Sequence, residues 1–289
     1  MKGIVLAGGS GSRLYPVTMG VTKQLLPIYD KPMVYYPISV LMIAGIRDIA
    51  IISSSSEIHR FKKLLGDGSH FGVQFQFIEQ LEPAGIAEAF ILSKEFIGED
   101  AVTLILGDNI FYGSGLNGVI KNAISNNVGA TIFAHRVSNP SQFGVVKLDE
   151  DGKPLSIVEK PEKPASKLAV TGLYIFNNDV IEIASNLKPS ARGELEITDV
   201  NSQYLEENKL KVAVLGRGYT WLDAGTHDAL LEAGKFVQIF EKRQGLKIAC
   251  LEEIAYYNGW LTIEQVKTIG KRYSKTSYGQ YLLSIADEQ

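Results

Sequence analysis

The sequence has a single cysteine and no histidine cluster, and both absences limit its chemistry. Cys250 is that cysteine, which excludes an internal disulfide, favours a reducing compartment and suits a buried apolar filler. The four histidines do not have the spacing of metal ligands. We therefore expect neither a disulfide scaffold nor a zinc-type site.

Long apolar runs and blocks of like charge are missing too. No apolar stretch reaches the ~18 residues of a membrane span, because Pro37 and Ser39 interrupt the segment 33–44. Gly8 breaks the first apolar stretch too early for a signal peptide. With 29 basic and 32 acidic residues the net charge is −3, so nothing favours a nucleic-acid or membrane surface. We expect a cytoplasmic protein that holds an anionic substrate with a few local cations.

The remaining composition is that of an ordinary globular protein. The chain has 289 residues, of which 45% are hydrophobic and 21% charged. That length allows a large core and one or two domains. We find no repeat of fixed period and no low-complexity segment.

A glycine-rich stretch follows the first apolar run. The run 4–7 has the pattern of a short strand buried on both faces, and Gly8, Gly9 and Gly11 come directly after it. Such glycines allow positive φ and close approach to a ligand, and several N–H groups can then point toward an anion. Arg13 and Lys23 add positive charge nearby. The stretch predicts a cradle for a polyphosphate.

These glycines allow three other interpretations. A P-loop requires a Lys-Ser or Lys-Thr pair at its end, and Ser12-Arg13 does not supply it. The dinucleotide fingerprint requires a third glycine where Leu14 stands, which counts against an oxidoreductase. From the glycines alone, an ordinary tight turn between a strand and a helix is an equally valid interpretation.

Strands and helices alternate through the first 129 residues. Strands are expected at 4–7, 48–53, 73–78 and 102–106, and helices at 32–44, 57–65, 86–96 and 116–124. This alternation is typical of βαβ units, so we predict an α/β fold, Rossmann-like, with a mixed, mostly parallel sheet flanked by helices. Ligands of such sheets bind beyond the carboxyl ends of the strands, where the glycine stretch and Asp108 are expected.

The pattern changes at about residue 130. Strand-like segments follow one another and predict an antiparallel addition to the sheet; they span 130–137, 144–148, 155–159 and 170–176. Further helices are expected at 194–207 and 226–240, and strands at 211–215 and 219–222. We predict an α/β domain over 1–240, in two parts that meet at about residue 129. Residues 241–289 predict a small helical extension, with helices near 252–258, 262–269 and 278–286, for subunit contact or regulation.

Three charged residues stand at the ends of predicted strands. Asp108 and Asp223 each follow a strand and precede a glycine-containing turn, which suits a Mg²⁺ site but also a simple turn cap. Lys160 follows the strand that ends at Glu159, where a solvated lysine is the plainer alternative. Together with the glycine stretch, the two aspartates favour metal binding.

The order of these motifs resembles the sugar-nucleotidyltransferases. The pattern L-A-G-G-x-G-x-R-L-x-P-x-T, with Lys23 after it, is similar to that family's signature. The resemblance continues to Cys250 through LGDN around Asp108, VEKP around Lys160, VTGLY, GELEITDVN and WLDAGTHD. KQLLPIYDKPMVYYP and RGELEITDVN look most like the subgroup that activates glucose 1-phosphate with dTTP. The resemblance covers almost the whole chain.

The resemblance implies that the part to about residue 129 binds the nucleotide and that the antiparallel, sugar-binding part, about 130–240, binds the sugar phosphate. It also implies roles for particular residues. The implied nucleotide-binding residues are Leu6, Gly8, Gly9, Gly11, Gln24, Gln80, Pro83 and Gly85. The implied sugar-phosphate-binding residues are Gly144, Glu159, Lys160, Val170 and Tyr174. Arg13, Lys23, Lys160 and Arg192 would be catalytic, and Asp108 and Asp223 would hold Mg²⁺. Within these sets, Gln80 and Gly85 would hydrogen-bond the thymine.

The implied reaction transfers a thymidylyl group from dTTP to glucose 1-phosphate, by in-line attack of the sugar phosphate on the α-phosphorus. The product would supply activated sugar for dTDP-rhamnose and related polysaccharides. One alternative is a nucleotide-sugar sensor without activity. Another is the same reaction with UTP or with another sugar 1-phosphate. The resemblance also implies a homotetramer with feedback regulation, and 250–254 resembles part of that regulatory surface. Tyr256-Tyr257-Asn258 departs from the basic residue expected there.

Overall fold

Parallel strands form the part of the sheet that carries the first glycine loop. The structure is a computed structural model that describes residues 1–9 and 11–287. Strand β1 (Lys2–Leu6) lies between β4 (Asp48–Ser54) and β6 (Val102–Leu106), and β5 (Gln74–Gln80) extends the sheet beside β4. All three pairings are parallel, so the strands end at the same edge of the sheet.

Antiparallel pairing extends the sheet on the other side. Strand β11 (Leu168–Phe176) lies antiparallel to β6, and the order along the sheet is β10-β9-β11-β6-β1-β4-β5. The remaining strands are β8 (Ala130–Arg136), β9 (Gly144–Leu148), β10 (Pro154–Glu159) and β12 (Leu210–Leu215). Strand β8 pairs with both β11 and β12, and β12 runs parallel to it. The predicted α/β class with a mixed sheet and an antiparallel addition is confirmed.

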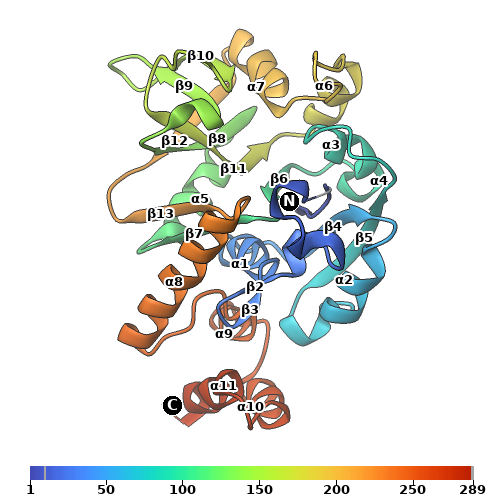
Figure 1. The fold of residues 1–289 in the computed structure, drawn as a ribbon, viewed down its shortest axis with the longest axis vertical. Coiled ribbons are helices and arrows are strands. Elements are labelled where there is room, and N and C mark those ends of the chain that lie inside the picture. The colour runs from blue at the N-terminus through green and yellow to red at the C-terminus, as the bar shows by residue number, and fades with distance from the viewer. Residues whose placement is uncertain (10, 288–289) are drawn as a thin grey trace.

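The sheet is buried on both faces because helices cover it (Figure 1). Neighbouring residues of β1 enter different cores: Ile4 belongs to one apolar cluster and Val5 to another. This alternation is the two-residue period of a strand whose two faces are both packed. The helices before residue 246 are α1 (Tyr35–Ile43), α2 (Ile58–Leu65), α3 (Glu88–Leu92), α4 (Lys94–Ile97), α5 (Leu116–Ser125), α6 (Val180–Asn186), α7 (Ile197–Glu206) and α8 (His227–Gln244).

Two short sheets and the carboxyl-terminal helices complete the fold. Strands β7 (Asn109–Gly113) and β13 (Tyr219–Asp223) form an antiparallel pair, as do β2 (Pro27–Ile28) and β3 (Lys31–Pro32). Helices α9 (Leu251–Tyr257), α10 (Ile263–Arg272) and α11 (Ser277–Asp287) lie at the end of the molecule opposite β9 and β10 (Figure 1). Within the described part of the chain no helix combines the length and apolar character needed to cross a membrane.

Several element boundaries differ from the predicted ones. Helix α1 begins at Tyr35 and not at residue 32, because Lys31 and Pro32 pair with the hairpin strand β2. The predicted helix 86–96 is divided at Ser93 into α3 and α4. Helix α7 begins at Ile197 and not at 194, because the preceding backbone bonds the loop before α3. Strand β7 and helix α6 were not predicted.

Candidate active site

The glycine loop leaves the carboxyl end of β1 and combines two kinds of constraint. Gly9 and Gly11 have φ of +96° and +59°, where a side chain would be strained. Gly8 has no such φ, but a Cβ there would lie 2.1 Å from Oε1 of Gln80. Ser10, in the middle of the predicted cradle, lies outside the described residues. The loop therefore needs glycine at 9 and 11 for its path and at 8 for space.

Two glutamine amides flank Gly8. Gln24 donates from Nε2 to the carbonyl oxygen of Gly8 at 3.2 Å, and its Oε1 accepts from Thr22 Oγ1 at 2.8 Å. Leu6 accepts a bond from the backbone N–H of Gly107 at 2.9 Å, which joins the ends of β1 and β6. The structure thus brings the predicted Leu6, Gly8 and Gln24 together.

The loop after β5 is tied to two neighbours. Gln80, the last residue of that strand, is buried and donates to Glu88 on α3. Gly85 has φ of +113°, and a Cβ there would lie 2.4 Å from the carbonyl oxygen of Leu195. The backbone N–H of Leu195 bonds the carbonyl of Ala84 at 2.6 Å. The loop that begins at Gln80 is therefore held against the segment before α7, and Pro83 is exposed on it.

The two predicted metal ligands face each other across the ends of β6 and β13. Asp108 forms an ion pair with Lys23, and its Oδ1 accepts from Asn109 Nδ2 at 2.9 Å. Burial alone would raise the pKa of Asp108, but Lys23 and these hydrogen bonds hold that pKa below its usual range. Burial and the charge of Asp108 raise the pKa of Asp223 to about 6, against the opposing effect of Lys23 and Arg13. Oδ1 of Asp223 is buried without a hydrogen-bond partner among the described residues.

Arg13 approaches the same pair of carboxylates. A Cβ at Gly225 would lie 2.9 Å from a terminal guanidinium nitrogen of Arg13 and 2.8 Å from Oδ1 of Asp223. The absence of a side chain at Gly225 therefore leaves space for the cation beside the acid. Lys23, which was expected on phosphate groups, here pairs with Asp108.

The predicted sugar-side residues lie around the carboxylate of Glu159. Its Oε2 accepts from Thr198 Oγ1 at 2.7 Å, and a Cβ at Gly144 would lie 3.3 Å from the same oxygen. That Cβ would be 3.7 Å from Val170. Tyr174 is buried nearby, and its pKa is raised by burial and by the charge of Glu159. Strands β9, β10 and β11 together position these four residues.

Two cations stand at the rim of this region. Lys160 is half-exposed, has φ of +40° and lies 3.5 Å from Oε1 of Glu159 through its ammonium nitrogen. Arg192 makes a forked contact with Glu196, with its Nη2 at 2.9 and 2.8 Å from the two carboxylate oxygens. The same nitrogen lies 3.5 Å from Oε1 of Glu159. Both cations are accessible to a ligand.

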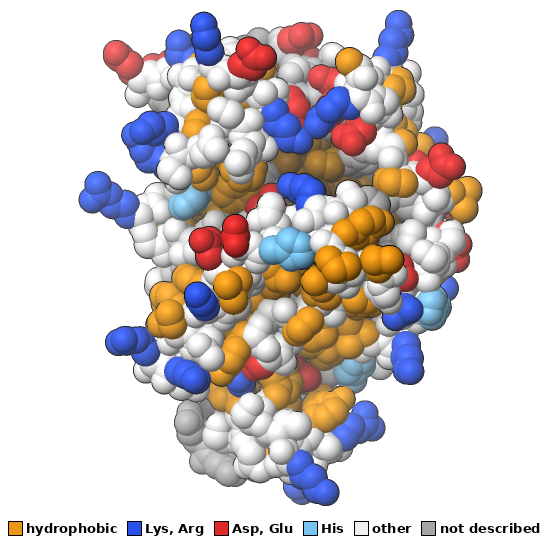
Figure 2. Space-filling model, in the orientation of Figure 1, with side chains coloured by type: hydrophobic (Ala, Val, Ile, Leu, Met, Phe, Trp, Pro, Cys, Tyr) orange, Lys and Arg blue, Asp and Glu red, His pale blue; other side chains and the backbone are white. Residues whose placement is uncertain are grey.

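These groups share one pocket. The predicted residues that line it are Arg13, Asp108, Gly144, Glu159, Lys160, Val170, Tyr174, Arg192 and Asp223. Figure 2 shows a hollow on this face, between the antiparallel part and the rest of the molecule, with basic and acidic side chains at its rim. Lys23 adjoins the pocket through Asp108, and the glycine loop and Gln80 lie at the same edge of the sheet.

Sequence reasoning missed three polar residues of the pocket. Asn109 accepts at Oδ1 from the backbone N–H of Gly172 at 3.0 Å and from Trp221 Nε1 at 2.5 Å. It therefore joins β7, β11 and β13 next to Asp108. Thr198 orients Glu159. Each of the three lies inside a family motif named above: Asn109 in LGDN, Trp221 in WLDAGTHD and Thr198 in GELEITDVN. The motifs could therefore have indicated these residues, whereas a search for charged residues could not.

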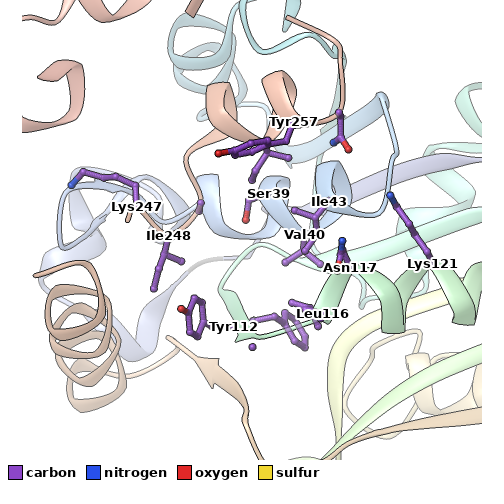
Figure 3. Close-up of a pocket in the computed structure, with 16 residues that line it drawn as sticks. Ser39, Val40, Ile43, Tyr112, Leu116, Asn117, Lys121, Lys247, Ile248 and Tyr257 are labelled. Atoms are coloured by element: carbon purple, nitrogen blue, oxygen red, sulfur yellow. The ribbon is translucent and has the colours of Figure 1, made fainter. Parts of the chain in front are cut away.

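A second pocket lies away from the glycine loop. It is bounded by α1, β7, the start of α5, the segment 247–249 and α9. Figure 3 shows Val40 and Ile43 of α1 within it, with Lys247 and Lys121 on opposite sides and Tyr257 on the side of α9. None of the predicted site residues lines this pocket.

Comparison with known proteins gives one consistent family. The family model described as nucleotidyl transferase matches residues 2–239. A glucose-1-phosphate thymidylyltransferase of Neisseria gonorrhoeae is 58% identical over 285 residues, 99% of each chain. One of Mycobacterium tuberculosis (strain ATCC 25618 / H37Rv) is 53% identical over 287 residues, again 99% of each chain.

A solved structure agrees with these relatives. A crystallised Bacillus anthracis chain, provisionally described as a glucose-1-phosphate thymidylyltransferase and bound to sucrose, superposes with a TM-score of 0.75 at 41% identity. The match covers 82% of this chain and 94% of that one. The chain therefore belongs to the nucleotidyl transferase family and, within it, to the glucose-1-phosphate thymidylyltransferases.

Proposed function

We propose that the protein transfers a thymidylyl group from dTTP to glucose 1-phosphate and releases dTDP-glucose and pyrophosphate. The observation that carries the proposal is the shared pocket, in which the two aspartates Asp108 and Asp223 and three cations line an opening near the glycine loop. The full-length relatives with this name support it. The pathway we propose for the product is dTDP-rhamnose and related polysaccharide synthesis, in the cytoplasm.

The nucleotide would lie along the edge formed by β1, β5 and β6. Gly8, Gly9 and Gly11 would contact its phosphates through backbone N–H groups, assisted by Arg13 and Lys23. The remaining residues proposed for this part are Leu6, Gln24, Gln80, Pro83 and Gly85. Gln80 is suited to the base because its amide lies beside Gly8 and not among the phosphate-binding cations.

The sugar phosphate would occupy the antiparallel side of the pocket. Gly144, Glu159, Val170 and Tyr174 line that side, and a carboxylate beside a Cβ-free surface suits the hydroxyl groups of a sugar. Lys160 and Arg192 would orient the phosphate from the rim. Arg192 would then exchange part of its contact with Glu196 for the incoming anion.

The chemistry requires charge neutralisation more than proton transfer. The sugar phosphate is already a nucleophile at neutral pH, so one of its oxygens can form the new bond to the α-phosphorus while the bond to pyrophosphate breaks. The barrier comes from the approach of two anions. Arg13, Lys160 and the loop N–H groups are placed to reduce it.

Asp108 and Asp223 fit a Mg²⁺ ion. Mg²⁺ typically takes one or two carboxylates together with phosphate oxygens. The raised pKa and the unpartnered buried oxygen of Asp223 indicate that this carboxylate can accept a further positive charge beside Lys23 and Arg13. The two aspartates would hold the ion, which when bound neutralises phosphate charge. In the described part of the chain no set of three or more His, Cys, Asp or Glu side chains is arranged for a metal, and the two aspartates are the protein groups that we propose for the ion.

We also propose that residues 241–289 provide subunit contacts or regulation in a homotetramer. The second pocket lies between this region and α1, and Tyr257 on α9 is largely exposed at it. An exposed aromatic beside a partly apolar pocket suits either a ligand or a neighbouring subunit.

One assay tests the proposed reaction. Pyrophosphate release should be measured with dTTP, UTP, CTP and ATP, each combined with glucose 1-phosphate or another sugar 1-phosphate, with and without Mg²⁺. We expect fastest release with dTTP, glucose 1-phosphate and Mg²⁺ together. Absence of release with every pair would contradict the proposal.

A further inference from the structure

Glu88, the first residue of α3, accepts two hydrogen bonds from the end of β5 and the loop that follows it. Gln80 donates from Nε2 to Glu88 Oε2 at 2.6 Å, and the backbone N–H of Ala84 donates to the same oxygen at 3.0 Å. Gln80 is only 3% exposed, so its amide depends on protein partners and not on bulk water for hydrogen bonds. One carboxylate oxygen thus closes the loop between β5 and α3 and contacts the buried amide.

These contacts decide which end of the Gln80 amide faces the glycine loop. A carboxylate only accepts hydrogen bonds, so the amide nitrogen must face Glu88 and the amide oxygen must face away. The hydrogen bond from the Ala84 N–H agrees with this, because it shows that the same oxygen, Glu88 Oε2, acts as an acceptor. The orientation of this amide is therefore set by its partners and is not arbitrary.

The amide oxygen is available beside Gly8. A Cβ at Gly8 would lie 2.1 Å from Gln80 Oε1, so this oxygen lies against the glycine backbone. Within residues 1–9 and 11–287 no group donates a hydrogen bond to it. The other amide beside Gly8 differs, because Gln24 uses its nitrogen on Gly8 and its oxygen on Thr22. Gln80 therefore presents a hydrogen-bond acceptor that has no partner among the residues that the structure describes.

We infer that Glu88 is a positioning residue that selects the base, by holding Gln80 Oε1 as an acceptor for the N3–H of a keto pyrimidine. The inference rests on the proposed function. Thymine and uracil carry a proton on N3, whereas N3 of cytosine is itself an acceptor and would face Gln80 Oε1 unfavourably. A site discriminates strongly against a substrate that leaves one of its buried polar groups unpaired, or that places an acceptor against an acceptor. The 5-methyl group of thymine does not take part in this selection.

The test compares kcat/KM for dTTP, dUTP and dCTP, each with glucose 1-phosphate. In Glu88→Ala the Gln80 amide is free to turn, so we expect the dTTP:dCTP ratio to fall about tenfold. The dTTP:dUTP ratio and the KM for glucose 1-phosphate should not change. Glu88→Gln should keep the wild-type ratio, because its side-chain amide oxygen can accept both the Gln80 and the Ala84 hydrogen bonds. Glu88→Asp, which keeps the charge but shortens the reach, should lower it.

The controls separate selection from folding. Glu95→Ala removes an exposed carboxylate from the neighbouring helix α4 and should leave all ratios unchanged. Thermal melting identifies a variant that does not fold, and if Glu88→Ala fails, Glu88→Asp provides the measurement. An unchanged dTTP:dCTP ratio in a folded Glu88→Ala, or an equal loss for all three nucleotides, would overturn the inference.

Failure of the proposed reaction would give a different result. In that case the wild-type protein would release no pyrophosphate from any triphosphate. Calorimetric dissociation constants for dTTP, dUTP and dCTP would then replace kcat/KM with the same variants. A dTTP:dCTP affinity ratio that falls in Glu88→Ala supports the inference, and one that does not overturns it.

Discussion

At the residue scale, Lys160 combines exposure with an unusual backbone. Its φ of +40° is rare for a residue with a side chain and costs of order 1–3 kcal/mol where it persists. The backbone N–H of Lys160 bonds the carbonyl of Phe143 at 3.1 Å, which holds this conformation. The strained position directs attention to function, since the half-exposed side chain contributes little packing.

We expect Lys160→Ala to lower turnover by roughly 10²–10³, the loss that follows removal of one preorganised electrostatic group. The thermal midpoint should hardly change, because the side chain is half-exposed. Pyrophosphate release and thermal melting measure the two quantities. Lys163→Ala, at an exposed position three residues on, is the matched control. Turnover near that of the wild type would remove Lys160 from the mechanism.

We expect Asp108→Asn to abolish Mg²⁺-dependent turnover, because the neutral amide replaces the charge that the cation requires. Lys23 would also lose its buried partner, so folding must be checked by melting. The measurement is turnover against Mg²⁺ concentration. Asp151→Asn, in an exposed turn, should reproduce the wild-type curve. The same curve for Asp108→Asn would argue against the metal role.

The sequence could indicate these charged residues but not their pairing. These residues, Asp108, Lys160 and Asp223, stand at the ends of strands, and the strands are visible in the sequence pattern. That Lys23 contacts Asp108 depends on the path of a loop across the sheet, which no local pattern encodes. The same holds for Asn109, whose partners Gly172 and Trp221 are distant in sequence.

At the element scale, the long buried segments were predictable and the short ones were not. Strands β1, β4 and β6 are continuous apolar runs, the pattern of strands covered on both faces. Strand β7 was missed because its partner β13 lies more than 100 residues away. Helix α1 was extended too far because Pro32 suits a first helical turn, whereas pairing with β2 takes precedence.

Four charged side chains, two of them buried, fix the β2–β3 hairpin to α8. Lys31 lies 2.9 Å from Oε1 of Glu241, and Lys247 lies 2.8 Å from Oε2 of the same residue. Asp30 contacts both lysines at 2.5 Å. The side chains of Lys31 and Glu241 are 2% and 4% exposed, so their charges cannot be screened by water. The cluster joins the segment that carries Lys23 and Gln24 to the helix before the carboxyl-terminal region.

We expect Glu241→Ala to lower the free energy of unfolding by about 3 kcal/mol or more, because it leaves Lys31 buried with one carboxylate fewer. Urea denaturation with a constant m-value measures the change. Glu232→Ala removes an exposed carboxylate from the same helix and should have little effect. Equal stability of the two variants would show that the cluster does not stabilise the fold.

At the scale of the whole molecule, the carboxyl-terminal helices share the main apolar core. Leu251, Ala255 and Val266 belong to the same buried cluster as Ile38 of α1 and Val5 of β1. The core behind the glycine loop is therefore completed by residues from the far end of the chain. The length of this region predicted that it is too short to bury much apolar surface by itself, but not which part of the chain it packs against.

This shared core predicts that damage in α9 destabilises the whole chain and not the extension alone. Leu251 is fully buried, and Leu251→Ala should cost about 2–5 kcal/mol, because the cavity it leaves cannot fully close. Leu246→Ala, at a leucine that is 57% exposed, should stay within about 0.5 kcal/mol of the wild type. Loss of pyrophosphate-releasing activity and loss of helical signal should coincide on heating Leu251→Ala, since one cooperative core supports both ends. Separate transitions, with activity retained after the first, would instead show that the extension unfolds on its own.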